Sequence, residues 1–253
     1  MVKCMSFLRL VELKKVDLKD PVLIHGVPGV GLVSKIAVSH LINQLKAELI
    51  AEIYGDLIPL PDGNAGISVD GSQLEIPSYR IYHARSSTGR SLLLVTSEAQ
   101  PIPWGQYQVI NLLLDYAEKL GTKIVVSLGG YVTDEGLGVY GAAYPEEMLD
   151  EMEAYGVKKL TGGYVTGAAG VVVGLAKIRG IKSICLLGTT PGSLPDARAA
   201  MMVLSVLEQW LGVKTDVSEL VEMDEMIRES TKPKEVKTQE VEEKKEEGVP
   251  YHT

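Results

Sequence analysis

The stretch that decides the fold of this chain is Pro21-Val22-Leu23-Ile24-His25-Gly26-Val27-Pro28-Gly29-Val30-Gly31. Its apolar start is typical of a buried strand, and its glycines are typical of a tight turn. Beyond the turn, Val33, Ile36, Ala37 and Leu41 recur at helical spacing. The pattern therefore predicts a strand, a turn and an amphipathic helix in that order.

The same alternation continues along the chain. Ile124–Leu128 and Ile181–Leu187 are apolar runs that suit strands buried on both faces, and Gln106–Leu120 carries apolar residues on one helical face. Ile67–Ile76 is split by Asp70-Gly71, which predicts a hairpin turn, and Gly163–Thr166 has the pattern of a short strand. Strands alternating with helices predict an α/β sandwich with helices on both faces of the sheet.

Composition and charge narrow the class of protein. The chain has 253 residues, 45% of them hydrophobic, which is enough for one large or two small globular domains. A net charge of −8 disfavours nucleic acid and anionic membrane as partners. No apolar run approaches the roughly 18 to 20 residues of a membrane span. Because Cys4 and Cys185 have no metal-ligand or disulfide spacing, we expect reduced thiols in a cytoplasmic protein.

The chain changes character near its end. We expect residues 1–229 to form a single α/β domain and residues 230–253 to form a charged flexible tail, because Lys232–Glu247 is mostly Lys and Glu. The tail ends in Val249-Pro250-Tyr251-His252-Thr253, where an aliphatic and an aromatic residue return. This tip is a candidate partner-binding site, and the alternative is a merely frayed terminus.

The glycine-rich turn has two possible functions. Gly26 and Gly31 are spaced like the glycines of a phosphate loop, which would bring backbone amides to a phosphate at a helix N-terminus. However, Leu32 and Val33 stand where such a loop needs Lys and then Ser or Thr. The sequence therefore favours a packing turn over a nucleotide site.

Other candidate chemistry is sparse. Glu98 and Gln100 follow a strand, where α/β folds place functional groups, so Gly29, Gly31, Glu98 and Gln100 form a possible pocket. Asp134 is adjacent to Glu135 in a loop, an arrangement that favours solvated carboxylates over a catalytic pair. No two histidines share metal-ligand spacing, and neither cysteine has a nearby histidine. We assign no catalytic residue, no metal site and no cofactor.

Several ordered segments together resemble the proteasome assembly chaperone family, most closely its archaeal branch, called PbaA and PbaB. The resemblance covers roughly Pro21 to Ile227. The segments that carry it are Pro21–Gly31, Ser97-Glu98-Ala99-Gln100-Pro101, Leu128-Gly129-Gly130-Tyr131, Thr166-Gly167-Ala168-Ala169-Gly170 and Leu186–Asp196.

The resemblance implies a three-layer α/β/α sandwich with a mixed sheet, similar to the phosphorylase and hydrolase fold, and no catalytic role. It also implies self-association and docking on the proteasome α-ring through a terminal motif of a hydrophobic residue, Tyr and any residue. Here Tyr251 is third from the end instead of penultimate. The extra residue would shift Tyr251 by about 3.3 Å in a pocket that also binds the terminal carboxylate.

Two functions from different classes follow. The first is a nonenzymatic, ring-like homo-oligomeric chaperone or scaffold whose tails bind the proteasome α-ring or another protein. The alternative is a small-molecule enzyme of phosphorylase or hydrolase type that uses the Gly26–Gly31 turn and Glu98. The sequence fixes neither the subunit number nor the identity of a partner.

Overall fold

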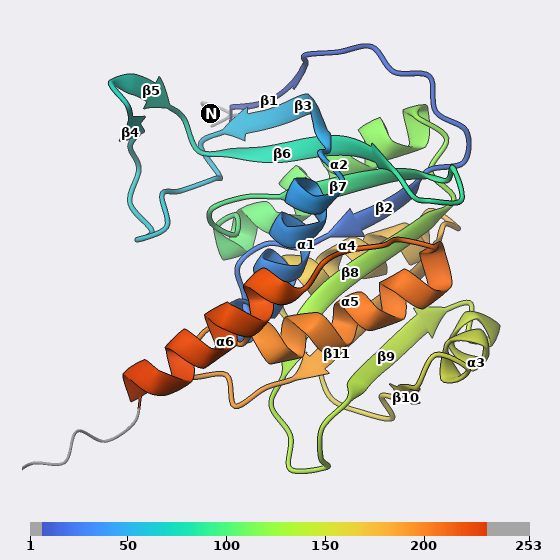
Figure 1. Ribbon diagram of the computed structural model, residues 1–253. Helices are drawn as coiled ribbons and strands as arrows, with labels where there is room; N and C mark the ends of the chain where they lie inside the picture. Colours follow the sequence, from blue (N-terminus) through green and yellow to red (C-terminus); the bar gives the residue numbers. More distant parts are fainter. Residues whose placement is uncertain (1–6, 232–253) are drawn as a thin grey trace, which may run out of the picture.

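A mixed sheet of nine strands forms the centre of the molecule (Figure 1). The structure, a computed structural model, describes residues 7–231, so the predicted binding tip Val249–Thr253 lies outside it. The strand order is β1-β3-β6-β7-β2-β8-β11-β9-β10. The strands of this sheet are β1 (Leu8–Glu12), β2 (Val22–His25), β3 (Glu48–Gly55), β6 (Ser78–Arg85), β7 (Ser91–Thr96), β8 (Ile124–Tyr131), β9 (Val139–Tyr144), β10 (Val157–Lys159) and β11 (Lys182–Thr189).

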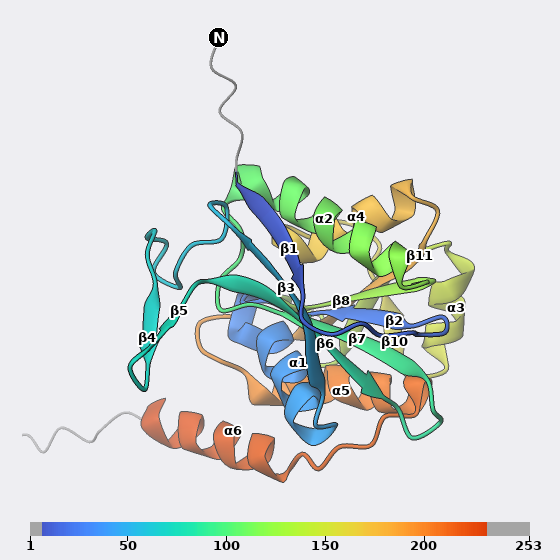
Figure 2. The same ribbon diagram turned by 90° about the horizontal axis from the view of Figure 1, so that it is seen from above.

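Helices cover both faces of the sheet (Figure 2). The first face carries α1 (Val33–Gln44), α3 (Glu147–Glu153), α5 (Ala197–Leu211) and α6 (Ser218–Thr231), and the second carries α2 (Gln106–Lys119) and α4 (Gly167–Ile178). Two 3₁₀ turns, η1 (Val30–Leu32) and η2 (Pro103–Gly105), precede α1 and α2. The three-layer α/β/α sandwich with a mixed sheet is therefore confirmed.

Strand alternation divides the core into two halves. In β2, Val22 and Ile24 pack under α1 and α5, whereas Leu23 packs under α2 and α4. Leu92 and Leu93 of β7 divide in the same way. Because successive side chains of a strand point to opposite faces, continuous apolar runs serve both halves at once.

Parallel pairing is confined to the middle of the sheet and to one edge. Strands β7, β2, β8 and β11 run parallel to one another, and β9 pairs antiparallel with β11 and parallel with β10. The chain reaches β9 directly from β8 through the loop Val132–Gly138. Strands β1, β3 and β6 extend the other side of the sheet by antiparallel pairing.

The prediction of a strand at Gly163–Thr166 is wrong. This segment is an irregular approach to α4, and the carbonyl oxygen of Val165 packs so closely on α4 that a Cβ at Gly170 would lie 1.9 Å from it. The strand beside β11 is instead β9, whose sequence Val-Tyr-Gly-Ala-Ala-Tyr is too rich in small residues to give a strand pattern.

The predicted hairpin is present, as strands β4 (Ser68–Asp70) and β5 (Gln73–Glu75). Its turn residues are Gly71 and Ser72, one position later than the expected Asp70-Gly71, and both have positive φ values, +51° and +72°. Two positive φ values are the signature of the type I′ turn, whose twist matches that of a hairpin. The hairpin projects from the body of the molecule (Figure 1).

Among the helices of residues 7–231, none has both the length and the apolar character that crossing a membrane requires. The helix that covers the most apolar surface, α5, begins at Asp196, whose carboxylate accepts a hydrogen bond of 2.8 Å from the Ala199 amide. It ends at Gly212, which adopts the left-handed conformation that glycine favours.

Candidate functional site at the carboxyl edge of the sheet

The loops that follow the parallel strands meet at one edge of the sheet. The chain leaves β2 through α1 on the first face and leaves β8 in the opposite direction, toward β9 and α4. Such a switch point leaves a crevice between neighbouring strands, where open α/β sheets bind ligands. A cavity of about 280 Å³ lies at this point and is lined by residues that include Gly29, Gln100, Gly130, Tyr131, Tyr164 and Thr166.

Two glycines of the turn are needed for packing. A Cβ at Gly26 would lie 2.4 Å from the Ser34 carbonyl oxygen, and one at Gly31 would lie 2.8 Å from the Thr190 hydroxyl. Gly31 also has a φ of +59°, and its carbonyl accepts a hydrogen bond of 2.8 Å from the Asp196 amide. These contacts support the interpretation of Gly26–Gly31 as a packing turn.

Gly29 differs from these two glycines. Its backbone is extended, with a φ of −162°, and a Cβ there would meet its nearest neighbours at 3.9 Å, an ordinary contact distance. Gly29 lines the cavity, whereas Gly31 does not. Nothing in the packing of the described part of the chain therefore requires glycine at this position.

Gln100 ties three segments of the edge together. Its amide nitrogen donates to the Pro28 carbonyl at 2.7 Å, and its amide oxygen accepts from the Ala168 amide of α4 at 3.0 Å. The Gln106 side chain of α2 donates to the same oxygen at 3.2 Å. The side chain thus holds the glycine turn against α2 and α4, a structural task that its position after β7 did not reveal.

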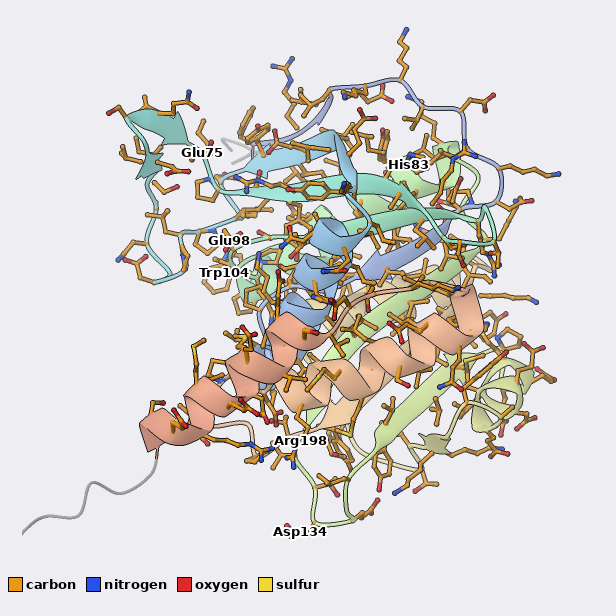
Figure 3. The ribbon with its side chains drawn as sticks, in the orientation of Figure 1. Glu75, His83, Glu98, Trp104, Asp134 and Arg198 are labelled. Carbon is orange, nitrogen blue, oxygen red and sulfur yellow. The ribbon has the colours of Figure 1, made fainter. Side chains whose placement is uncertain are left out.

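Glu98 lies apart from the cavity. Its carboxylate pairs with the Lys35 ammonium at 2.7 Å, and Lys35 also donates to the Ser97 carbonyl at 3.1 Å. Figure 3 shows Glu98 on the flank of the molecule near Trp104. Of the four residues proposed as a pocket, the structure brings Gly29 and Gln100 to the cavity. Gly31 packs against Thr190, and Glu98 does not line the cavity.

The other candidate side chains do not converge on the cavity. Asp134 lies at the tip of the loop between β8 and β9 (Figure 3), and the amide of Glu135 is held by the Thr133 hydroxyl at 3.2 Å. Within the described ranges, no group of three or more His, Cys, Asp or Glu residues is arranged to hold a metal ion. Cys185 is buried, and burial raises the pKa of its thiol, which disfavours the nucleophilic thiolate.

The second face of the sheet carries a buried polar cluster that the sequence pattern did not indicate. Both ring nitrogens of His25 lack a hydrogen-bond partner in the part of the chain that the structure describes, and so do the hydroxyls of Tyr79 and Ser127. The His25 and Tyr79 rings lie 5.9 Å apart, and Ser127 is the β8 neighbour of His25. Burial lowers the pKa of His25 to about 4 and raises that of Tyr79, so both groups are neutral at pH 7.

Exposed apolar side chains lie at the mouth of the cavity. Tyr164 is 96% exposed, and Val30 and Val132, which also line the cavity, are exposed. Trp104 is 76% exposed and lies outside the cavity, near Glu98. The aromatic residues stand beside loop-forming residues, in Pro103-Trp104-Gly105 and Gly163-Tyr164, which is the signal that could have marked them. An apolar rim of this kind is typical of a surface that binds another protein.

A family model described as the PAC2 family matches residues 23–233, which includes both core halves and the entire edge described above. The chain belongs to the PAC2 family. It is 31% identical to Pyrococcus furiosus PbaB, an archaeal proteasome activator, with a TM-score of 0.81 over 89% of this chain and 98% of that chain. The resemblance to the proteasome assembly chaperone family is thus confirmed.

Two further relatives agree. Pyrococcus furiosus PbaA, an archaeal homolog of proteasome-assembly chaperone, is 30% identical, with a TM-score of 0.74 over 88% of this chain and 89% of that chain. An uncharacterized protein of Methanocaldococcus jannaschii is 30% identical over 208 residues, which cover 80% of this chain and 78% of that protein. The similarity to these PAC2 relatives extends over most of both chains.

The packing of the glycine turn gives a first prediction. We expect Gly26→Ala to lower the free energy of unfolding by about 1–3 kcal/mol, because the added methyl group meets a backbone carbonyl that cannot move independently of α1. Urea denaturation measures the change. Gly162→Ala is the matched control, since a Cβ there meets nothing within 4 Å, and it should change stability by less than about 0.5 kcal/mol. Equal effects would contradict the packing interpretation.

The buried histidine gives a second prediction. Unfolded His25 titrates near pH 6.5 and folded His25 near pH 4, so the unfolded state binds more protons between these values. The stability that depends on neutral His25 is complete above pH 6.5 and is lost as the pH falls toward 4. We expect this residue to contribute about 2 kcal/mol to the loss of stability between pH 7 and pH 5. Urea denaturation of His25→Gln should show a correspondingly weaker pH dependence, and an unchanged one would contradict the assignment.

Proposed function

We propose that this protein is a nonenzymatic homo-oligomeric chaperone or scaffold that binds a proteasome, partly through its C-terminal tail. The observation that supports the proposal is the match to PbaB over 89% of this chain and 98% of that chain, since a likeness of this extent covers the fold as a whole and not one motif. PbaB is described as a proteasome activator, and PbaA as a homolog of proteasome-assembly chaperone. A proteasome partner also suits a protein of the cytoplasm.

The carboxyl edge supports a binding role more than a catalytic one. The polar side chains that the sequence offered there already serve contacts within the chain, as Gln100 does with Pro28 and Ala168, and Lys35 does with Glu98. Apolar and aromatic side chains, such as Val132 and Tyr164, are also exposed there. Aromatic residues on an open surface are characteristic anchors of protein interfaces.

In the proposed function, multivalency raises the affinity with which the tails of one oligomer bind the partner. One tail tip of the composition Val249–Thr253 offers few contacts, so a single tip would bind weakly. When several copies in one ring present their tips to a ring-shaped partner, each bound tip raises the effective concentration of the others. The charged stretch Lys232–Glu247 supplies length between the globular part and the tip.

Capture of a proteasome tests the tail. We expect deletion of Val249–Thr253 to weaken co-elution with an archaeal proteasome core particle by at least tenfold in apparent affinity, because avidity is lost at every copy together. The matched control deletes residues 238–242, which removes the same length of chain and keeps the tip. Undiminished capture by the tip deletion, with the oligomer intact, would contradict the tail mechanism. Absence of capture by the full chain would contradict the proteasome as partner.

The cavity at the switch point favours a second candidate, a small-molecule enzyme that uses the turn around Gly29. Glu98 does not line the cavity and pairs with Lys35, so this alternative lacks the cavity carboxylate on which it relied. A thermal-shift screen of nucleotides and metabolites separates the two functions. We expect no saturable stabilisation from the chaperone proposal, and a ligand whose effect is abolished by Gly29→Leu would favour the enzyme, because that side chain would occupy the cavity.

A further inference from the structure

The β4–β5 hairpin presents one apolar face to solvent. Val69 and Leu74 are cross-strand partners, so their side chains share a face, and they are 65% and 72% exposed. Ile67 and Ile76 continue the same alternation at the base of the hairpin and are also exposed. The other face carries polar residues, such as Ser68 and Glu75.

A two-stranded hairpin is only marginally stable by itself. The ion pair of 2.8 Å between Glu75 and Arg80 anchors this one at its base. The hairpin nevertheless projects away from the nine-stranded sheet (Figure 1). Four exposed aliphatic side chains on one face of such a projection form a ridge that is suited to insertion into an apolar groove.

A groove of matching character lies between α4 and β9. It has a volume of about 220 Å³ and is lined by residues that include Ala142, Tyr144, Gly170, Val173, Gly174 and Lys177. Residues 167–176 of α4 include no polar side chain. A helix that is apolar on all sides is normally buried, yet Gly174, Lys177 and Ile178 of α4 are exposed.

Gly174 singles out the groove within α4. Glycine in the middle of a helix lowers its stability, and a Cβ at Gly174 would meet nothing within 4 Å. No contact among residues 7–231 therefore explains this glycine. Because glycine has no side chain, another element can approach the backbone of α4 closely at this point of the groove.

Charge distinguishes the hairpin from the groove. Residues 57–79 contain Asp62, Asp70 and Glu75 and no Lys or Arg. Residues 154–195, which include α4, contain five basic residues (Lys158, Lys159, Lys177, Arg179 and Lys182) and no Asp or Glu. Lys159 and Arg179 pair with carboxylates outside this range, and Glu75 pairs with Arg80. The opposite charges that face solvent on the two surfaces are therefore Lys177 at the groove and Asp70 at the end of the hairpin.

We propose that the β4–β5 hairpin of one copy docks into the α4–β9 groove of the next copy. The hairpin and β9 lie on opposite sides of the molecule (Figures 1 and 2). Two different surfaces that meet head to tail propagate from copy to copy, and they close into a ring when the rotation allows it. The inference rests on the homo-oligomer of the proposed function and assigns the surfaces that build it.

Two variants separate the surfaces. The hairpin variant carries Val69→Ser with Leu74→Ser, and the groove variant carries Gly174→Arg, both at exposed positions. We expect each to have the mass of a monomer in light scattering, while the wild-type chain has the mass of an oligomer. The matched controls are Ser68→Ala with Gln73→Ala on the other hairpin face and Glu222→Arg on α6. Both controls should keep the wild-type mass, and a circular-dichroism spectrum like that of the wild-type chain, with a cooperative melting transition, verifies folding of every variant.

Mixing the two variants tests the head-to-tail arrangement itself. The intact groove of the hairpin variant can accept the intact hairpin of the groove variant, so the mixture should yield heterodimers and nothing larger. A mixture that stays monomeric would overturn the proposal, because the intact hairpin and the intact groove would then fail to join two copies. Variants that keep the wild-type oligomer mass would overturn these surfaces while leaving the chaperone function intact, whereas a monomeric wild-type chain would overturn both the surfaces and the oligomer.

Discussion

Close approach of backbone to backbone at the carboxyl edge is the constraint on which the rest of the structure depends. A Cβ at Gly26 would lie 2.4 Å from the Ser34 carbonyl oxygen, and a Cβ at Gly130 would lie 2.3 Å from that of Val30. These contacts set α1 directly on the end of β2 and bring the end of β8 against η1. Because the turn is so compact, Gly26 and Gly31 serve packing, and the crevice beside the turn stays small.

Polar side chains of this edge form hydrogen bonds within the chain that join its loops and helices. Gln100 joins the glycine turn to α2 and α4, and the Ser34 hydroxyl donates to the Val27 carbonyl at 2.6 Å. Apolar and aromatic side chains remain on the outside, together with a projecting hairpin and an open groove beside α4. This arrangement of polar side chains inside and apolar side chains outside is better suited to contacts with proteins than to chemistry on a small molecule. The fold is that of the PAC2 family.

Much of the fold was predictable because local signals and tertiary packing agree. The apolar runs of β2, β8 and β11 are buried on both faces, and α2 follows its apolar periodicity from Gln106 to Lys119. Prediction failed at β9, where the strand consists largely of small residues. It also failed at Tyr164-Val165, where two neighbouring apolar residues precede a helix and form no strand. In those places, pairing with β11 and contact with α4 decide the conformation, and neither leaves a periodic signal.

By itself, the sequence determined the α/β layering, the packing turn after β2 and the charged character of the C-terminal segment, because each depends on residue types close together in the chain. Only the tertiary structure decided which candidates share a site: it brought Gln100 to Gly29 and left Glu98 on the flank with Lys35. It also placed a hairpin with an exposed apolar face and an apolar groove on opposite sides of the molecule. Such relations join residues far apart in the chain, and long-range packing alone sets their distances.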